Sequence, residues 1–213
     1  MSVAVLTSRL SLAEQIKTHL VAQITSGVLA PGDRLVELKI AAEMQTSQAP
    51  VREALRELEA IGAVETRRNR GSRVRIISDA EHQEMYEVRA QLEVFAARRV
   101  AEAKAPVKEE LMQCIQKMRK AAHAQDFLEY AKHNFMFHRH VVTAAGNSVL
   151  LEVWENLNIP LRSVFNLSRA DRDLELLAES HLLIVDAIAA GDPELAAKVT
   201  DAHVLDNSPQ GNI

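Results

Sequence analysis

The stretch AAEMQTSQAPVREALREL, residues 41–58, determines how the first third of the chain is expected to fold. It predicts the end of one helix, a tight turn, and a second helix that begins at Ser47, whose hydroxyl is expected to cap the first turn. Pro50 fits the third helical position, where its missing N–H breaks no intrahelical hydrogen bond. Gly62 is expected to end the helix. A short helix, a turn and a capped helix form a helix-turn-helix pattern.

The second of these helices has an apolar face and a polar face. The apolar stripe consists of Val51, Ala54, Leu55, Leu58 and Ile61. Gln48, Arg52 and Arg56 lie four residues apart on a neighbouring strip, which is expected to face solvent. An arginine-bearing strip near a helix N-terminus has the chemistry of a helix that enters the major groove of DNA, where Arg52 can also meet a phosphate.

The flanking segments complete a winged helix. Residues 11–14 form a capping box that opens a first helix. Its predicted buried stripe is Leu12, Ile16, Leu20 and Ile24. Residues 36–44 are expected to form the short second helix. After Gly62 the period changes to two, and residues 68–71, Arg-Asn-Arg-Gly, supply the turn of a two-stranded ribbon whose second strand includes Val74 and Ile76.

The charge of the chain is unevenly distributed. The formal net charge is −4, but residues 1–78 carry 11 Lys and Arg against 8 Asp and Glu, whereas residues 79–213 carry 14 against 21. Five arginines fall within residues 67–75, where Gly71 would let the backbone approach a phosphate wall and Arg70 could enter the minor groove. A solvated arginine-rich loop is the alternative, but the agreement of turn, cap, arginine strip and basic hairpin favours nucleic acid.

The remaining two thirds of the chain predict an antiparallel bundle of about six helices. The expected helices cover about residues 79–103, from Pro106 onward, 126–146, 148–168 with a kink at Pro160, 172–190 and 193–205. The inward face of the first is expected to carry Met85, Val88, Leu92, Phe95 and Ala96. The fold class is therefore mainly α, with a winged helix-turn-helix at 11–77, an all-α bundle at 79–205, a mobile arm at 1–10 and a disordered tail at 206–213.

Three histidines fall on apolar faces of three different helices of the expected bundle. They are His138, His181 and His203. A buried histidine is usually a hydrogen-bonded core residue, and each of these three would need its own buried partner. Asn134 precedes His138 by four residues, so both side chains can point at one bound atom. The positions alone leave two interpretations open, a metal site and a set of structural histidines.

Neither a signal peptide nor an apolar run of the ~20 residues that span a membrane is found. Cys114 is the only cysteine, so no intramolecular disulfide can form, and a buried structural thiol is expected. A cytoplasmic protein with no membrane partner fits these features.

Three segments resemble the GntR family of bacterial transcription regulators. They are ITSGVLAPGDRL at 24–35, SQAPVREALRELEAIGAVE at 47–65 and RRNRGSRV at 67–74. The resemblance implies that Ser47, Gln48, Ala49 and Arg52 face the DNA groove and that Arg70 and Gly71 form the wing tip. The family usually has Arg and Thr at positions 48 and 49 and Gly at position 45, where this chain has Gln45. Arginine reads guanine whereas glutamine prefers adenine, so the operator is expected to differ.

The bundle resembles the FCD ligand-binding domain of the FadR-type branch of that family. The similar segments are EVRAQLEVFAARRVA at 87–101, NFMFHRHVVTAAGN at 134–147 and the two helices that carry His181 and His203. The family motif of Asp-x3-His and two further histidines binds a divalent metal, which implies Asn134, His138, His181 and His203 as ligands, with Asn in place of Asp. Zinc is the expected ion, with nickel or manganese as alternatives. Arg89 is expected either to clamp an effector carboxylate or to pair with Glu93.

The resemblance implies a homodimeric, non-enzymatic regulator that binds double-stranded DNA and responds to a small carboxylate metabolite. Three neutral imidazoles and an amide would leave an ion's charge uncompensated, which favours an anionic effector. A metal-dependent hydrolase with a DNA-tethering domain is an alternative, although no carboxylate is evident in the sequence beside the three histidines as a general base; Glu179 is expected on a different face from His181. A regulator with a metal-free effector pocket is a third interpretation.

Overall fold

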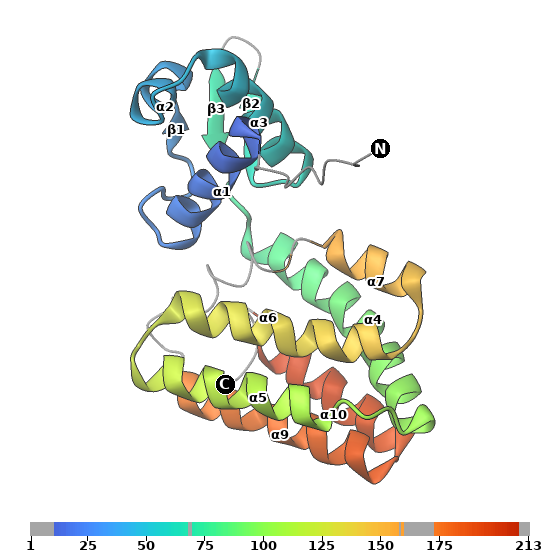
Figure 1. Ribbon diagram of the computed structural model, residues 1–213. Helices are drawn as coiled ribbons and strands as arrows, with labels where there is room; N and C mark the ends of the chain where they lie inside the picture. The colour runs from blue at the N-terminus through green and yellow to red at the C-terminus, as the bar shows by residue number, and fades with distance from the viewer. Residues whose placement is uncertain (1–10, 68–69, 158, 160–172, 209–213) are drawn as a thin grey trace, which may run out of the picture. The chain divides into compact units, whose positions relative to one another are not determined.

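The computed structural model describes residues 11–67, 70–157, 159 and 173–208. The predicted N-terminal arm, the wing turn at 68–69, the kink at Pro160 and the last five residues lie outside this range. The chain divides into two compact units, Met1–Ile76 and Ile77–Ile213, which are described separately. The described part of the first unit consists of three helices and a small sheet, and the described part of the second consists of helices (Figure 1). The predicted fold class is confirmed.

The first unit is a winged helix-turn-helix. In chain order it contains α1 (Leu12–Thr25), β1 (Arg34–Leu35), α2 (Glu37–Glu43), α3 (Gln48–Ala60), β2 (Val64–Arg67) and β3 (Gly71–Val74). The capping box of α1 is complete, because Ser11 Oγ accepts the Glu14 N–H and the Glu14 carboxylate accepts the Ser11 N–H. The sheet is antiparallel with strand order β1-β3-β2. Only two strands were predicted, because β1 is too short to show a period.

The core of this unit lies between α1, α3 and the sheet. Its buried side chains include Ile16, Leu20, Ile24, Val51, Ala54, Leu55, Leu58 and Val64. The predicted stripe of α3 is therefore confirmed up to Leu58. Leu12 was placed wrongly: it is 41% exposed at the first helical position, and Ala13 is buried in its place. Ile76 is also exposed, because β3 ends at Val74.

The helix-turn-helix turn depends on a left-handed residue. Gln45 has φ 51°, and its N–H donates to Ala42 O while the Thr46 N–H donates to Ala41 O. This is the Schellman pattern of hydrogen bonds, which normally uses glycine at the left-handed position. The end of α3 shows the same pattern with Gly62, whose φ is 73°. The position at which the family usually has glycine is thus one where this chain holds a strained glutamine.

Replacing Gln45 by glycine is expected to stabilise the winged helix by about 1 kcal/mol, because a side chain in the left-handed region costs roughly that much. Urea denaturation of the full chain followed by circular dichroism measures the change. The matched control is Gln113→Gly, an exposed position in the middle of a helix of the second unit, where glycine should instead destabilise by about 1 kcal/mol. Destabilisation by both substitutions would contradict the role given to Gln45.

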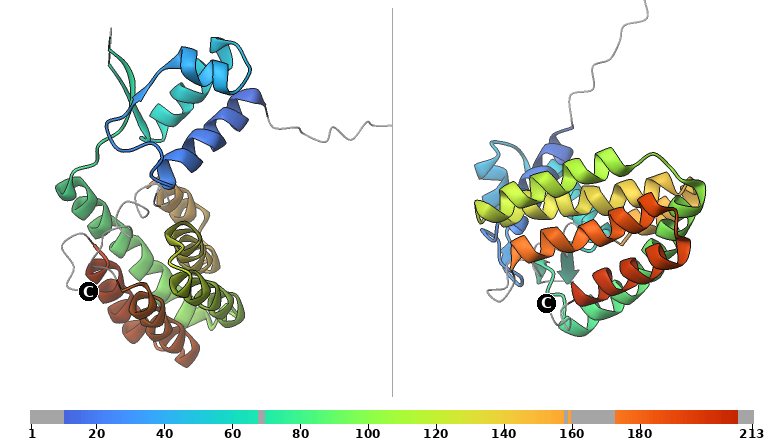
Figure 2. Two further views of the ribbon diagram at one scale, coloured as in Figure 1. Left: turned by 90° about the vertical axis from the view of Figure 1, so that its left-hand side faces the viewer. Right: turned by 90° about the horizontal axis from the view of Figure 1, so that it is seen from below.

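The second unit is a helical bundle. It contains α4 (Asp79–Ala103), α5 (Lys108–His123), α6 (Phe127–Ala144), α7 (Ser148–Glu155), α9 (Leu174–Ala190) and α10 (Pro193–Asp206). The starts of five helices are capped by a side-chain oxygen that accepts a first-turn N–H, namely those of Ser78, Asp126, Asn147, Asp173 and Asp192. Neighbouring helices pack in the order α4, α10, α9, α5, α6 and back to α4, so the bundle closes on itself (Figure 2). The inner faces of these five helices together form one apolar core.

Three predicted boundaries in this unit are corrected. The helix that starts at residue 148 ends at Glu155 rather than continuing through 157, since Asn156 caps it and a turn follows. α5 begins at Lys108, two residues after Pro106, because Val107 occupies its N-cap. The first residues of the predicted tail are ordered, since α10 extends to Asp206 and Ser208 is only 2% exposed.

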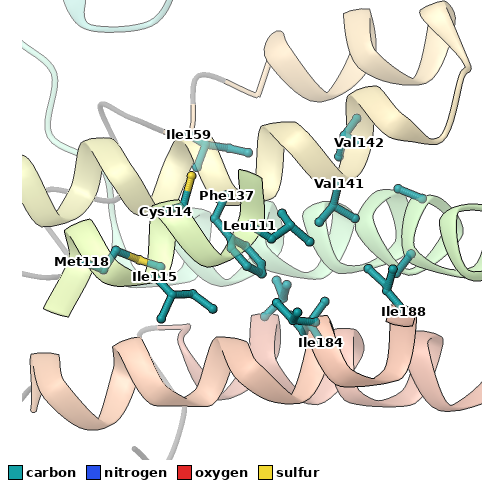
Figure 3. Close-up of a cluster of buried hydrophobic side chains, with 14 of the residues drawn as sticks. Leu111, Cys114, Ile115, Met118, Phe137, Val141, Val142, Ile159, Ile184 and Ile188 are labelled. Carbon is teal, nitrogen blue, oxygen red and sulfur yellow. The ribbon is translucent and has the colours of Figure 1, made fainter. Parts of the chain in front are cut away.

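The apolar core of the bundle is continuous across these helices. Figure 3 shows Leu111, Ile115 and Met118 of α5 close to Phe137 and Val141 of α6 and to Ile184 and Ile188 of α9. Cys114 is buried in the same cluster, as predicted. No helix in the described ranges is long and apolar enough to cross a membrane.

The inward face of α4 differs from the prediction. Met85 and Ala96 are buried as expected, but Val88 and Phe95 are 51% and 44% exposed. The interior instead receives Arg89 and Glu93, which are 2% and 1% exposed. An arginine and a glutamate four residues apart can be buried together because each compensates the charge of the other.

The connection between the two units is short. The Arg75 N–H donates to Ala63 O, and the side chain of Ile76 lies against Gly32, so both residues belong to the winged helix. Ser78 already caps α4, with its hydroxyl accepting the Glu81 N–H. Ile77 is therefore the only residue between the last contact of one unit and the first cap of the other.

Candidate nucleic-acid interface and metal centre

The N-terminus of α3 is exposed, as a DNA-reading helix requires. Ser47 occupies the N-cap, but its hydroxyl makes no capping hydrogen bond, so that part of the prediction is wrong. The side chain is exposed, and water can satisfy it. Ala49 is also exposed, and Gln48 is partly exposed at the first helical position. The first-turn N–H groups of α3 are consequently available to an anion such as a DNA phosphate.

The predicted polar strip of α3 is exposed. Arg52 and Arg56 both lie on the surface. Arg52 Nη1 lies 3.6 Å from Glu37 Oε2 of α2, which is a surface ion pair of small energy that a phosphate can replace. The strip therefore has the composition and exposure expected of a nucleic-acid contact.

The wing carries further positively charged side chains. Arg70 is exposed directly before β3, and Gly71 has φ 74°, a conformation that strains any other residue. Arg34 was not predicted as part of this interface. It lies on β1 opposite Arg73 of β3, and its guanidinium is close to Gly71. Only the pairing of the two-residue strand β1 with β3 brings it there, and the sequence gives no sign of that pairing.

The three predicted histidines meet in the interior of the bundle. His138 of α6, His181 of α9 and His203 of α10 are 2%, 1% and 8% exposed, and one ligand nitrogen of each lies within 4.8 Å of the others. Their ring centroids are 4.2–5.3 Å apart. Histidines from three helices thus face one point, as predicted from their faces.

Each of the three rings directs Nδ1 at an oxygen. His181 Nδ1 lies 2.8 Å from Leu177 O, and His203 Nδ1 lies 3.1 Å from the Ser180 hydroxyl, which itself donates to Leu177 O. His138 Nδ1 lies 2.7 Å from Glu93 Oε2. These acceptors favour the tautomer with the proton on Nδ1, which leaves the lone pair of each Nε2 free for another partner.

The charge state of the rings fits this arrangement. Burial and, to a lesser extent, the neighbouring His138 lower the pKa of His181 to about 3. Burial also lowers the pKa of His203 well below its usual value, with help from His181 and His138. The pKa of His138 is lowered by burial although Glu93 opposes the shift. All three imidazoles are therefore neutral near pH 7, which is the form that binds metals.

Asn134 joins the same cluster from α6. Its Oδ1 lies 2.8 Å from His181 Nε2. With the proton of His181 on Nδ1, both of these atoms carry lone pairs, and two lone pairs at that distance repel. Either the amide turns its NH2 group toward the ring, or both atoms bind the same cation. Three imidazoles and an amide oxygen within reach of one point fit a divalent ion.

A carboxylate that the sequence did not reveal lies directly behind His138. Glu93 Oε1 accepts hydrogen bonds from Arg89 Nε at 2.6 Å and from Trp154 Nε1 at 2.8 Å, while Glu93 Oε2 faces His138. Burial would raise the pKa of Glu93, but Arg89 and His138 outweigh it and lower the pKa to about 2. Glu93 was not predicted at this place, because only tertiary packing brings it to His138. It faces Nδ1 and so does not contradict the expectation that no general base lies beside the histidines.

Arg89 is the partner of Glu93. Of its two predicted roles, the structure contains the ion pair four residues along the helix. The guanidinium is buried and also lies 5.4 Å from the centre of the Tyr86 ring. Glu179, in contrast, lies on the surface in a two-bond pair with Arg119, as its position in the sequence predicted.

Comparison with known proteins finds a matching family for the winged helix and another for the bundle. Residues 12–74 match the gntR family of bacterial regulatory proteins, and residues 84–206 match the FCD domain. The chain is 39% identical over 197 residues to a Paenarthrobacter nicotinovorans protein named "Probable D-xylose utilization operon transcriptional repressor", covering 92% of this chain and 87% of that one. It is 29% identical over 198 residues to the gluconate operon transcriptional repressor of Bacillus licheniformis, covering 90% and 81%.

A solved structure has the same fold. The E. coli McbR/YncC chain superposes with a TM-score of 0.77 at 25% identity, covering 93% of this chain and 96% of that one. These relatives are transcription regulators and not enzymes. The hydrolase alternative is accordingly set aside, and Glu93 supports this since it faces Nδ1 of His138 rather than the free Nε2 side.

Proposed function

Because the chain belongs to the gntR family of bacterial regulatory proteins and carries an FCD domain, we propose that it is a DNA-binding regulator whose bundle binds a small carboxylate through a divalent metal. The observation that carries this proposal is the convergence of three neutral histidines whose Nδ1 atoms are all engaged elsewhere. Their Nε2 atoms have the lone pairs that an ion needs. The protein acts in the cytoplasm, where its operator is.

His138, His181, His203 and Asn134 would hold the ion. Imidazole nitrogens suit zinc and nickel, whereas manganese prefers oxygen ligands, so zinc or nickel is the expected occupant. When bound, the ion supplies a positive charge and an open position that attract an anionic ligand. The only carboxylate found against a histidine of this cluster in the described part of the chain is Glu93, and its charge is already balanced by Arg89. A small carboxylate is therefore the expected effector.

The names of two relatives support a chemical class for the effector. One is named for D-xylose utilisation and another for gluconate. Gluconate is a polyhydroxy carboxylate, which combines a metal-binding carboxylate with hydroxyl groups for hydrogen bonding. Sugar acids are thus the first effectors to test.

The regulator is expected to work as a homodimer. Exposed apolar side chains lie on two helices that pack against each other, Val88 and Phe95 on α4 and Val149 and Val153 on α7. Burying such side chains against a second copy removes apolar surface from water. A dimer presents two winged helices to two half-sites of one operator. Light scattering of the purified chain tests this assembly.

Fluorescence anisotropy with labelled DNA from upstream of its own gene tests the proposed function. In the presence of zinc, a sugar acid such as gluconate is expected to change the operator Kd by about 5- to 150-fold, the usual range of coupling between two sites. Chelating the metal should abolish this response. The uncharged sugars D-xylose and D-glucose are the matched ligands without a carboxylate, and they should leave the Kd unchanged.

Two outcomes would contradict parts of this proposal. A response to sugar acids that survives chelation would mean that the effector pocket works without a metal. A response of the same size to the uncharged sugars would rule out recognition of the carboxylate.

A further inference from the structure

The buried carboxylate of Glu93 lies where three helices of the bundle meet. Its carboxylate joins three helices: Arg89 on its own helix α4, His138 on α6 and Trp154 on α7. The carboxylate is 1% exposed, so water does not compete for these contacts. Glu93 Oε2 has no hydrogen bond of good geometry within the described ranges, and it lies 2.7 Å from His138 Nδ1.

The two carboxylate oxygens of Glu93 contact different partners. Oε1 accepts from Arg89 Nε and Trp154 Nε1, which fixes the plane and direction of the carboxylate. Oε2 then lies 2.7 Å from His138 Nδ1, which is an ion-pair distance. Trp154 is fully buried and its ring stacks on Phe135 of α6 at 5.2 Å, so the donor to Oε1 is itself held in place.

A carboxylate behind a metal-binding histidine fixes the tautomer and the ring orientation and makes the ligand more basic. His181 and His203 have weaker partners in this position, a backbone carbonyl and a hydroxyl. With Asn134 in place of an acidic residue, the proposed ligands would carry no negative charge, and Glu93 is a carboxylate in contact with one of them. The negative charge of Glu93 should therefore matter more for metal binding in this chain than it would if residue 134 were an aspartate ligand.

We propose that Glu93 is the positioning residue of the candidate metal centre: it holds His138 in the metal-binding tautomer and couples that histidine to Trp154. This inference rests on the proposed function, because it concerns the same centre. Loss of the carboxylate should weaken metal binding without removing a ligand. A change at the centre should in turn alter the surroundings of the indole, since His138, Glu93 and Trp154 form one chain of contacts.

Zinc titration of the full-length, metal-stripped chain tests both parts. Competition with a chromophoric chelator should show that Glu93→Gln weakens zinc binding by about 10- to 100-fold. Trp154 is the only tryptophan, so emission of the wild-type chain reports on this site alone. Because zinc has no redox activity, any emission change reflects the surroundings of the ring. The wild-type emission should shift as zinc binds, and the shift should be lost in Glu93→Gln.

The matched control is Glu129→Gln, which removes a carboxylate 3.3 Å from His133, a histidine of the same helix outside the cluster. Its zinc affinity should equal that of the wild type. Glu93→Asp keeps the charge and should recover part of the affinity. If Glu93→Asp binds zinc no better than Glu93→Gln, the role of the carboxylate charge is refuted.

The possible failures can be told apart. If the wild type binds no zinc, the proposed metal-dependent function fails and this inference with it. Zinc binding by Glu93→Gln within twofold of the wild type overturns only the role of Glu93. Should Glu93→Gln not fold, the wild-type titration still decides, because unchanged Trp154 emission at saturating zinc overturns the coupling.

Discussion

Replacing His181 by alanine is expected to reduce the zinc affinity of the chain by more than about 100-fold, since loss of a contact behind a ligand already costs 10- to 100-fold. His181 is the most deeply buried of the three histidines, and its ring lies 4.2 Å from that of His203. Its Nε2 also faces Asn134, so the substitution removes one ligand and the partner of another. Elemental analysis of the purified proteins measures the metal bound per chain.

His133→Ala is the matched control for that experiment. His133 lies on α6 but pairs with Glu129 rather than joining the cluster, and it should leave the metal content unchanged. Thermal unfolding of the metal-free proteins shows whether the cavity left at position 181 has disrupted the bundle. Equal metal content in a folded His181→Ala protein and the wild type would remove His181 from the ligand set.

Replacing Arg52 by alanine is expected to weaken operator binding by about 1–3 kcal/mol if the side chain reads a base, which is about 5- to 150-fold in Kd. If Arg52 instead meets a phosphate, the loss should be similar for all DNA sequences, and the slope of log K against log salt should fall by about 1. Its exposed position on α3 is compatible with both contacts. Fluorescence anisotropy at several salt concentrations, with specific and unrelated DNA, distinguishes them.

Arg139→Ala is the matched substitution outside the winged helix. Arg139 is also a surface arginine with an acidic partner, Glu155, but it belongs to the bundle. It should bind the operator as the wild type does. If both substitutions weaken binding equally, the effect comes from overall charge and α3 is not the recognition helix.

Much of the fold was predictable because the signals are local. The caps at Ser11, Asp126 and Asp192 and the left-handed Gly191 fix helix ends within a few residues of sequence, and the structure has each of them. β1 was missed since two residues carry no period. The orientation of α4 was misjudged for a different reason. A hydrophobic pattern assumes that charges face water, but Arg89 and Glu93 satisfy each other inside, so Val88 and Phe95 are left outside.

The candidate metal centre was predictable in part. Three histidines on apolar faces are an unusual pattern, and the spacing of Asn134 and His138 put both on one face of a helix. The residues behind the histidines were not predictable. Glu93 reaches His138 only because α4 packs against α6, and no sequence spacing encodes that contact. Such partners depend on how helices far apart in sequence meet.

The single residue between the two units limits how a signal can pass from the bundle to DNA. Peptide bonds are planar, so Ile77 and the capping residue Ser78 contribute only four backbone torsions. A long flexible linker would absorb a small displacement of α4 as random motion. The helix that carries Glu93 is the one that begins at this short connection.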